Sequence, residues 1–367
     1  MSSDLLYSDT EEDLRASVRR LLVDRCPPEL VLTAYDSASA DFSAVWTALA
    51  VELGLAGLLV PESLGGAGAS TREAAVVMEE LGRAAAPSPY LSSAVLATVA
   101  LRTAGETQTL GALAAGQSTG TLTVPLSTGP QEFVGSVRLA EAGLVGRVTS
   151  VAGAAEADVL VVPVVGADGL ELHTVPRTAD GVRLTPVLSL DMTRPLADVE
   201  FSGAASTRVD NGNADAAVRE ALLCAAVLLS SEQLGLAQWC LETTLAYVKD
   251  RKQFGRAIGS YQALKHRLAD LWLECTSAAA AARYAADTYA RGDADAQTAA
   301  AVAQAYCSDV AVHAAEECVQ LHGGIGMTWE YPAHLYLKRA KSDQLAFGTA
   351  YAHRARLAEL VDLPVSS

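Results

Sequence analysis

The feature that most constrains how this chain folds is a change in the spacing of its apolar residues, which occurs twice along the sequence. In residues 1–115 and again in residues 214–367, apolar residues recur at the three- and four-residue spacing of helices packed on one face. In residues 116–213, short runs of Val, Leu and Thr alternate instead with Gly, Pro and Asp, as in strands and tight turns. The sequence therefore predicts three domains with these bounds: an N-terminal α-helical domain, a middle β domain and a C-terminal helical bundle.

The middle domain is expected to be an antiparallel barrel or sandwich. Its strand-like runs, such as TLTVPL, ADVLVVPVV and LELHTV, follow one another too closely for the helical crossovers that parallel strands require. The last domain contains long Ala-rich helical stretches broken at Gly-bearing turns, which predicts four or five helices packed as a bundle. The chain is thus expected to belong to the α+β class.

The charge of the chain excludes one class of partner. Its formal net charge is -16, with 43 acidic against 27 basic residues, and the sequence contains no basic block. Phosphate-binding grooves depend on clustered Lys and Arg, so no nucleic-acid partner is expected.

The cysteines and the first residues indicate a compartment. Six cysteines lie mostly in apolar helical stretches without a CxxC pair, which predicts core thiols in a reducing environment. The N-terminal residues MSSDLLYSDTEEDL are acidic and polar, whereas a signal peptide is basic and then apolar. No apolar run approaches the roughly 20 residues needed to cross a bilayer. A cytoplasmic protein without a membrane span is predicted.

Two segments of the last domain carry candidate binding residues. In YVKDRKQFGRAIGSYQ a helix ends, a Gly-containing turn follows and a second helix starts, so that Arg251 can meet a phosphate and Phe254 a ring. In VQLHGGIGMTWEYP, Gly323, Gly324 and Gly326 allow the backbone to approach an anionic group closely. Taken alone, each segment also fits an ordinary connection between helices.

Together the two segments resemble the RxxFG…Q and QxxGGxG…EYP signatures of the acyl-CoA dehydrogenase family, in the same order and at similar separation. LGLAGLLVPESLGGAGAS is similar to the family's N-terminal LGxxGxxxPExxGGxG loop, and EELGR follows it. GRVTSVAGAAEADVLVVP and LDMTRPLADVEFSG are similar to strands of its middle domain. Because these matches are ordered along nearly the whole chain, the chain is identified as a member of this family.

The resemblance implies a fold, a reaction and a cofactor. The family combines an N-terminal helical domain, a middle antiparallel β domain and a C-terminal four-helix bundle, and it assembles as dimers or dimers of dimers with FAD at the subunit interface. It oxidises acyl-CoA thioesters and passes electrons to an electron-transfer flavoprotein or a similar acceptor. Its RxxFG arginine and Gly-Gly turn reach the adenine and pyrophosphate side of the FAD held by a neighbouring subunit. The corresponding cofactor-binding positions here are Arg251, Phe254, Gln262, Gln320, Gly323, Gly324 and Thr349.

The family's carboxylate base is missing from both of its usual positions. The reaction removes the α proton of the thioester while hydride leaves the β carbon for the flavin, so a base is indispensable. The family places a Glu before a Gly-Thr pair near the end of the chain, where this sequence has Phe347, or on the first long helix of the last domain, where it has Ala225. Neither side chain accepts a proton. The Arg that normally follows the second position is replaced by Ala226.

The half-site for the chain's own flavin ring also departs from the family. The flavin-facing TEPxxGSD segment is here TVPLSTGP, with Val124 in place of Glu, and Val148 stands where Lys is common. The residues offered to a neighbour's flavin are kept. This asymmetry resembles the base-less subunits of heteromeric acyl-CoA dehydrogenases, in which a paralogous subunit of a heterotetramer supplies the Glu and most flavin contacts. The ending with His353 and Arg354 suits that subgroup.

The chemical class of the substrate can be inferred only by analogy with other members of the family. Heteromeric members of the family are associated with bulky acyl-CoA substrates, including steroid side chains, because the loss of one active site leaves space in the interface. The resemblance thus implies a fatty acyl or a steroid side-chain acyl-CoA as the substrate.

Two alternatives also fit the sequence. A homo-oligomeric dehydrogenase can use another carboxylate, for which Glu232 and Asp343 are the candidates, although Glu232 lies two helical turns or about 10 Å beyond Ala225. A pseudoenzyme can stabilise a partner without contacting the cofactor, although the presence of Arg251 and Gln320 weighs against it.

The sequence predicts neither a metal site nor a nucleophile motif. His266 and His322 have no Cys or carboxylate at metal-ligand spacing and are interpreted as core histidines. No Gly-x-Ser-x-Gly elbow is present.

Overall fold

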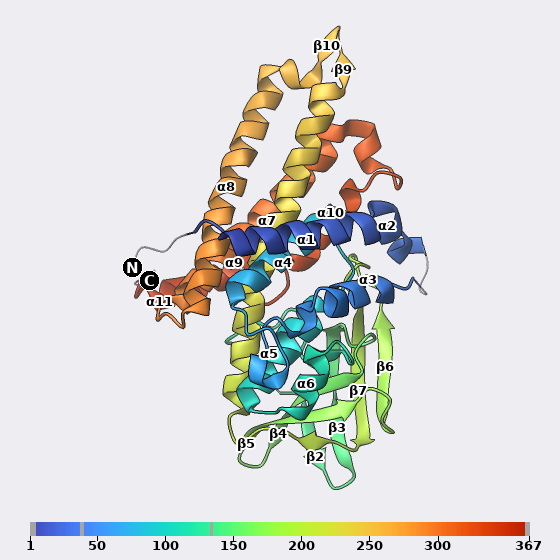
Figure 1. Cartoon of the computed structure of the whole chain (residues 1–367), viewed down its shortest axis with the longest axis vertical. Helices are drawn as coiled ribbons and strands as arrows, with labels where there is room; N and C mark the ends of the chain where they lie inside the picture. The colour runs from blue at the N-terminus through green and yellow to red at the C-terminus, as the bar shows by residue number, and fades with distance from the viewer. Residues whose placement is uncertain (1–4, 37–39, 133–134, 364–367) are drawn as a thin grey trace.

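The computed structural model describes residues 5–36, 40–132 and 135–363. Helices at the start of the chain, a sheet in the middle and a bundle of long helices at the end follow in the predicted order, and the fold-class prediction is confirmed (Figure 1). The sheet occupies one end of the molecule, and α7, α8 and the β9–β10 hairpin extend to the other end (Figure 1). The division into three domains at residues 115 and 213 stays a prediction.

The N-terminal helices begin where capping residues precede amphipathic stretches. α1 (Asp9–Arg25) follows Ser8 and α4 (Thr71–Arg83) follows Ser70, and in both cases a capping box joins the Ser to a Glu at the third helical position. The other elements of this region are α2 (Pro28–Asp36), α3 (Ser43–Thr47), η1 (Ala48–Glu52), η2 (Leu55–Gly57), η3 (Glu62–Leu64), η4 (Tyr90–Ala97), α5 (Thr98–Ala104) and α6 (Gln108–Ala114).

Within the described residues, the middle of the chain forms one eight-stranded sheet in the order β6-β7-β3-β2-β4-β5-β8, with β1 beside β4. Most neighbours are antiparallel, as predicted, but β1–β4 and β2–β4 are parallel. The sequence pattern did not indicate these two pairs, because parallel neighbours are usually connected by a helix. Here β2 and β4 are connected by the strand β3, and β1 is connected to β4 through β2 and β3. The strands are β1 (Gly120–Leu122), β2 (Val137–Ala140), β3 (Gly143–Ala152), β4 (Val159–Gly166), β5 (Gly169–Pro176), β6 (Val182–Val187), β7 (Leu196–Ala204) and β8 (Thr207–Arg208).

The C-terminal bundle is built around α7, which packs against α4, α8 and α9. By length and composition alone α7 could cross a membrane, but 89% of its most apolar window is buried inside the protein, as expected for a central helix that is apolar on all sides. The elements are α7 (Ala214–Asp250), β9 (Lys252–Gln253), β10 (Arg256–Ala257), η5 (Ile258–Ser260), α8 (Gln262–Ala290), α9 (Ala296–His322), η6 (Gly323–Met327), α10 (Ala333–Asp343) and α11 (Ala350–Leu360).

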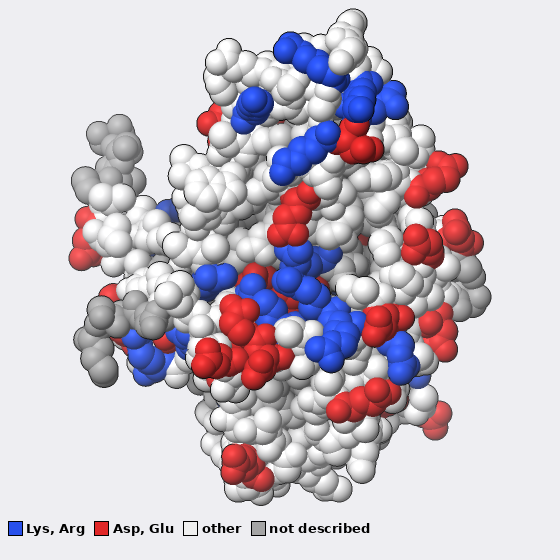
Figure 2. All heavy atoms as spheres, turned by 45° about the horizontal axis from the view of Figure 1, so that its top comes forward, with Lys and Arg blue, Asp and Glu red and all other residues white. Residues whose placement is uncertain are grey.

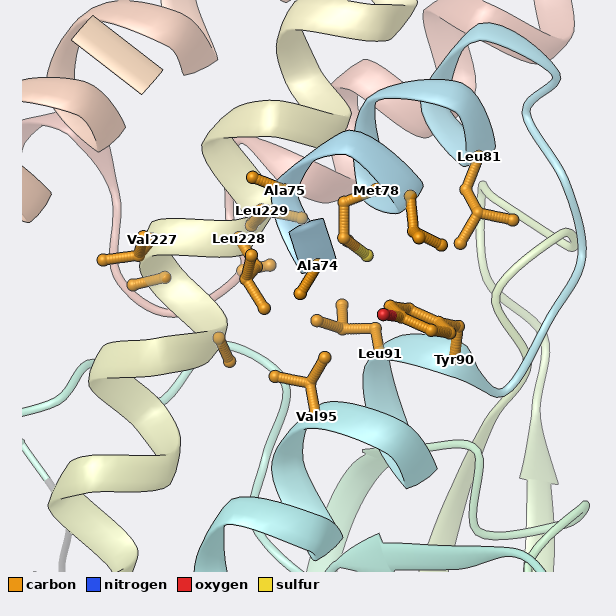
Figure 3. Packing of buried hydrophobic residues seen from close by; sticks show 14 of the residues in the cluster. Ala74, Ala75, Met78, Leu81, Tyr90, Leu91, Val95, Val227, Leu228 and Leu229 are labelled. Carbon is orange, nitrogen blue, oxygen red and sulfur yellow. The ribbon is translucent and has the colours of Figure 1, made fainter. Parts of the chain in front are cut away.

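The N-terminal helices and the bundle share one core where α4 crosses α7. A Cβ atom on Gly235 of α7 would lie 1.8 Å from the carbonyl oxygen of Glu79, and one on Gly82 of α4 would lie 2.1 Å from that of Glu232. The two backbones are therefore in direct contact at this crossing, which is possible only because both positions are glycine. Figure 3 shows apolar side chains of α4, η4 and α7 that pack together in this core: Ala74, Ala75, Met78, Leu81, Tyr90, Leu91, Val95, Val227, Leu228 and Leu229.

Candidate functional site

Four of the predicted cofactor-binding residues meet around one hollow at the end of the bundle. Arg251 directly follows α7, and Gln320, Gly323 and Gly324 lie where α9 gives way to η6. All four line a hollow of about 630 Å³. Its other lining residues are Tyr247, Gln253, Ile258, Leu264, Arg267, Leu321, His322 and Ile325. Two segments that are distant in the sequence thus form one surface.

The backbone of the Gly-Gly turn is open toward this hollow. Gly323 has φ 63° and ψ -136°, a conformation that only glycine adopts readily, and its N–H donates to the carbonyl oxygen of Gln320. A Cβ atom added at Gly323 or Gly324 would meet no atom within 4 Å. An anionic group can therefore approach the main chain more closely here than at a turn that carries side chains, which fits the pyrophosphate of FAD.

Two basic side chains, those of Arg251 and Arg267, line the hollow. Figure 2 shows Lys and Arg gathered at the end of the molecule that carries the β9–β10 hairpin. Arg251 is exposed, and its side chain has no hydrogen-bond or ion-pair partner among the described residues. Arg267 of α8 is already paired, with its Nε donating to Glu317 over 2.8 Å. Arg251 is thus free to bind an anionic ligand.

Phe254 and Gln262 are close in sequence to residues that line this hollow, but they do not line it themselves. Phe254 sits between β9 and β10 with 90% of its surface exposed and with φ 51°, which is unusual for a bulky residue. Gln262 is the first residue of α8 and is also exposed. The base of the hairpin is fixed by a hydrogen bond from the N–H of Ile258 to the carbonyl oxygen of Arg251, over 2.8 Å. The cofactor roles of Phe254 and Gln262 stay predictions.

The structure does not bring Thr349 to the hollow. Thr349 caps α11, and its Oγ1 accepts a hydrogen bond from the N–H of Ala352 over 3.3 Å. The whole of α10 lies between Thr349 and the Gly-Gly turn. The cofactor contact predicted for Thr349 would therefore belong to a different part of the cofactor site, and it stays a prediction.

The two usual base positions are filled with apolar side chains that solvent does not reach. Phe347 and Ala225 are both fully buried. The N–H of Phe347 donates to the carbonyl oxygen of Leu126 over 2.9 Å, which holds the two segments against each other. The hollow beside Phe347 is only about 60 Å³. A carboxylate that lines it, Glu132, lies on an exposed loop and had not been singled out from the sequence.

Two hollows lie beside the altered flavin segments. One of about 210 Å³ is lined by Thr123, Pro125 and Val148, and the other is much smaller. The smaller hollow, lined by Leu126, Ala152, Gly153 and Arg194, measures about 10 Å³, room for little more than one water molecule. A flavin ring does not fit in this smaller hollow without movement of the surrounding chain.

The alternative base Glu232 lies in a buried ion cluster. Both of its carboxylate oxygens accept from Nη2 of Arg194 at 2.6 Å, and one accepts from Nη1 of Arg339 at 2.5 Å. Burial alone would disfavour ionisation, but attraction to Arg194 and Arg339 outweighs it and lowers the pKa of Glu232. A carboxylate that two arginines hold in its ionised form is a poor proton acceptor, which weighs against Glu232 as the base.

The second alternative, Asp343, belongs to the same cluster. Nη1 of Arg194 donates to its Oδ1 over 2.7 Å, whereas its Oδ2 is buried without a hydrogen-bond partner among the described residues. Burial and the nearby negative charge of Glu232 raise the pKa of Asp343 to about 8. Asp343 lines neither the hollow beside Phe347 nor the one beside Arg251.

Asp343→Asn should change how stability depends on pH. The folded protein holds the Asp343 proton up to a pKa of about 8, whereas the unfolded chain releases it near the ordinary value of 3.8. Wild type therefore loses stability as pH rises through this window, because the folded state binds more protons than the unfolded state. The Asn variant lacks this loss, so its free energy of unfolding should rise relative to wild type between pH 5 and pH 8. Urea denaturation at both pH values measures the gap, and a constant gap would contradict the assignment.

Sequence reasoning missed the environment of His322. Its interpretation as a core histidine is confirmed, since only 2% of its surface is exposed, but it also lines the hollow and hydrogen-bonds to the hydroxyl of Tyr331. The same interpretation of His266 was wrong, because His266 of α8 is exposed. The available signal for His322 was its position directly before Gly323 in the sequence. Arg194 and Arg339 were also missed, because nothing local in the sequence distinguishes a buried arginine from a surface one.

All six cysteines are buried free thiols, as predicted. Across the part of the chain that the structure describes, no group of three or more His, Cys, Asp or Glu residues is arranged to hold a metal ion.

Comparison with known proteins agrees with the observed fold. Residues 8–114 match the family described as "Acyl-CoA dehydrogenase, N-terminal domain", and residues 216–361 match "Acyl-CoA dehydrogenase, C-terminal domain". The chain is 36% identical over 350 residues to the acyl-CoA dehydrogenase IpdE2 of Mycolicibacterium smegmatis, covering 95% of this chain and 98% of that protein.

Two solved structures of similar fold contain two named components. The ChsE4-ChsE5 complex from Mycobacterium tuberculosis includes a chain with TM-score 0.87 and 27% identity, with coverage of 99% of this chain and 100% of that one. A variant of the Tcur3481-Tcur3483 steroid ACAD includes one with TM-score 0.86 and 27% identity, with coverage of 96% and 98%.

Proposed function

Because this chain belongs to the acyl-CoA dehydrogenase family, whose members oxidise a CH–CH bond of acyl-CoA thioesters, we propose that it is a base-less subunit that completes the FAD site of a catalytic paralogue in a heterotetramer. The observation that carries the proposal is the contrast between its two half-sites. The surface formed by Arg251, Gln320 and the Gly-Gly turn is open and basic, whereas the region of the usual base is closed around Phe347.

The residues present fit one end of FAD, which homologues in the family bind. When bound, FAD accepts the hydride that leaves the β carbon of the acyl group. Arg251 would bind the pyrophosphate or adenine side of a neighbour's FAD, and Gly323 and Gly324 would let that group approach the main chain. This chain supplies charge and shape to the site, and the paralogue supplies the base that removes the α proton.

The comparisons support a heteromeric assembly and a bulky substrate. The ChsE4-ChsE5 and Tcur3481-Tcur3483 structures each carry the names of two components, and the second is called a steroid ACAD. We infer an acyl-CoA substrate with a bulky, steroid-like acyl group, with an electron-transfer flavoprotein or a similar protein as the electron acceptor. A self-sufficient homo-oligomer is less well supported, because both Glu232 and Asp343 are buried in the ion cluster.

The FAD content of the protein tests the proposal. The chain expressed alone should contain little FAD and oxidise no acyl-CoA, whereas coexpression with the right paralogue should give a heterotetramer with one FAD per pair of unlike chains. Native mass, flavin absorbance and acyl-CoA oxidation measure this. An active homo-oligomer with one FAD per chain would overturn the proposal and direct attention to Glu232, Asp343 and Glu132.

Within the same complex, Arg251→Ala should weaken FAD binding by about 10- to 100-fold, because hydrogen bonds to charged groups contribute roughly 1.5–3 kcal/mol. Arg256→Ala is the matched control, since the Arg256 guanidinium already lies 3.9 Å from the centre of the Tyr261 ring. Unchanged FAD binding in the Arg251 variant would instead favour a pseudoenzyme that contacts only its partner.

A further inference from the structure

The loop that carries Gly323 and Gly324 is closed by the side chain of His322. Nδ1 of His322 lies 2.6 Å from the carbonyl oxygen of Cys318, one turn earlier in α9, so Nδ1 carries a proton. Nε2 lies 2.6 Å from the hydroxyl of Tyr331. In the neutral ring Nε2 accepts from this hydroxyl, and in the protonated ring it donates to it, so the bond persists in both states. The side chain of His322 thus connects the end of α9 to Tyr331, in the segment that follows η6.

The same imidazole connects this loop to the end of α7. Its ring centre lies 4.3 Å from that of Tyr247 and 4.6 Å from that of Tyr331, so the histidine is packed between two aromatic rings. Only 2% of its surface is exposed. Tyr247 lies one helical turn before Arg251, whose N–H donates to the carbonyl oxygen of Tyr247 over 2.8 Å. The two segments around the hollow are therefore held at a fixed separation through His322.

We propose that His322 and Tyr331 are positioning residues for the cofactor, and we call their hydrogen bond the His322–Tyr331 clasp. A loop that contains Gly323, Gly324 and Gly326 is entropically costly to order, so an FAD that binds it pays that cost unless the loop is ordered beforehand. The clasp orders it and sets its distance from Arg251. This inference rests on the proposed function, because it assigns the clasp to the same half-site.

Substitutions at His322 separate the two hydrogen bonds of the ring. His322→Gln places an amide near the position of Nε2, so it can keep the bond to Tyr331. His322→Asn places an amide near Nδ1, so it keeps only the bond to the carbonyl oxygen of Cys318. Tyr331→Phe removes the clasp and leaves His322 in place. A positioning role predicts that Asn and Phe behave alike and that Gln behaves like wild type.

Two measurements on the coexpressed complex test the clasp: the rate of FAD release after dilution, followed by flavin fluorescence, and amide hydrogen exchange of residues 323–330. Tyr331→Phe and His322→Asn should each raise the release rate about fivefold, as expected for one hydrogen bond of ordinary net strength, and should speed exchange in the loop. His322→Gln should do neither. Tyr289→Phe is the matched control, since it removes the bond to Glu220 at the far end of α8, a helix of 29 residues and roughly 43 Å.

The outcomes distinguish this inference from the proposed function. Faster loop exchange with unchanged FAD release would show that the clasp orders the loop but that the loop does not contact FAD, which overturns the proposed function. Unchanged loop exchange in both Tyr331→Phe and His322→Asn would overturn the clasp, while the Arg251→Ala result still decides the proposed function. Equal effects of Gln and Asn at position 322 would also overturn it, because a purely structural role of the ring predicts that pattern.

Discussion

Gly235→Ala is expected to destabilise the folded chain by at least about 4 kcal/mol, enough to leave most of it unfolded or insoluble. The added Cβ would lie 1.8 Å from the carbonyl oxygen of Glu79, far inside van der Waals contact. The helices cannot separate easily to make room, because Gly82 brings α4 equally close to Glu232 and the ion cluster holds Glu232 in place. Intrinsic helix propensity predicts the opposite sign, since Ala is favoured over Gly by about 1 kcal/mol within a helix.

Gly111→Ala is the matched control for this prediction. Gly111 lies within α6, and a Cβ atom added there would approach the carbonyl oxygen of Leu64 no closer than 4.0 Å. This variant should be as stable as wild type or more stable by up to about 1 kcal/mol. Thermal and urea denaturation of the two variants compare the effects directly. A Gly235→Ala protein with wild-type stability would show that α4 and α7 do not make this close contact.

Local patterns in the sequence were sufficient to predict the order of the fold. Helical spacing at both ends and strand-like runs in the middle each depend on neighbouring residues, so the helix–sheet–helix order could be deduced without tertiary contacts. The signature residues Arg251, Gln320, Gly323 and Gly324 could be assigned for a different reason, which was resemblance to a family. The structure then brought these four residues to one hollow.

The features that sequence reasoning did not find depend on contacts between distant segments. The β2–β4 pair is parallel because β3 serves as the connection, a topology that no local pattern encodes. The His322–Tyr331 clasp requires the chain to turn back over nine residues. The ion cluster collects Asp191 and Arg194 from the loop before β7, Glu232 from α7, and Arg339 and Asp343 from α10, and no local pattern in the sequence indicates that these segments meet.

Arg339→Leu is expected to destabilise the protein by about 3–5 kcal/mol, because it leaves buried carboxylates without a partner. Arg339 is buried, its Nε lies 2.8 Å from Asp191, its Nη1 donates to Glu232 over 2.5 Å, and its Nη2 donates to Oγ1 of Thr193 over 2.6 Å. Urea denaturation at neutral pH measures the loss. Arg183→Leu is the control, since it breaks an exposed ion pair with Glu200 and should have no measurable effect. Equal stability of both variants would mean that the cluster does not join the sheet to the bundle, and Glu232 would again be a candidate base.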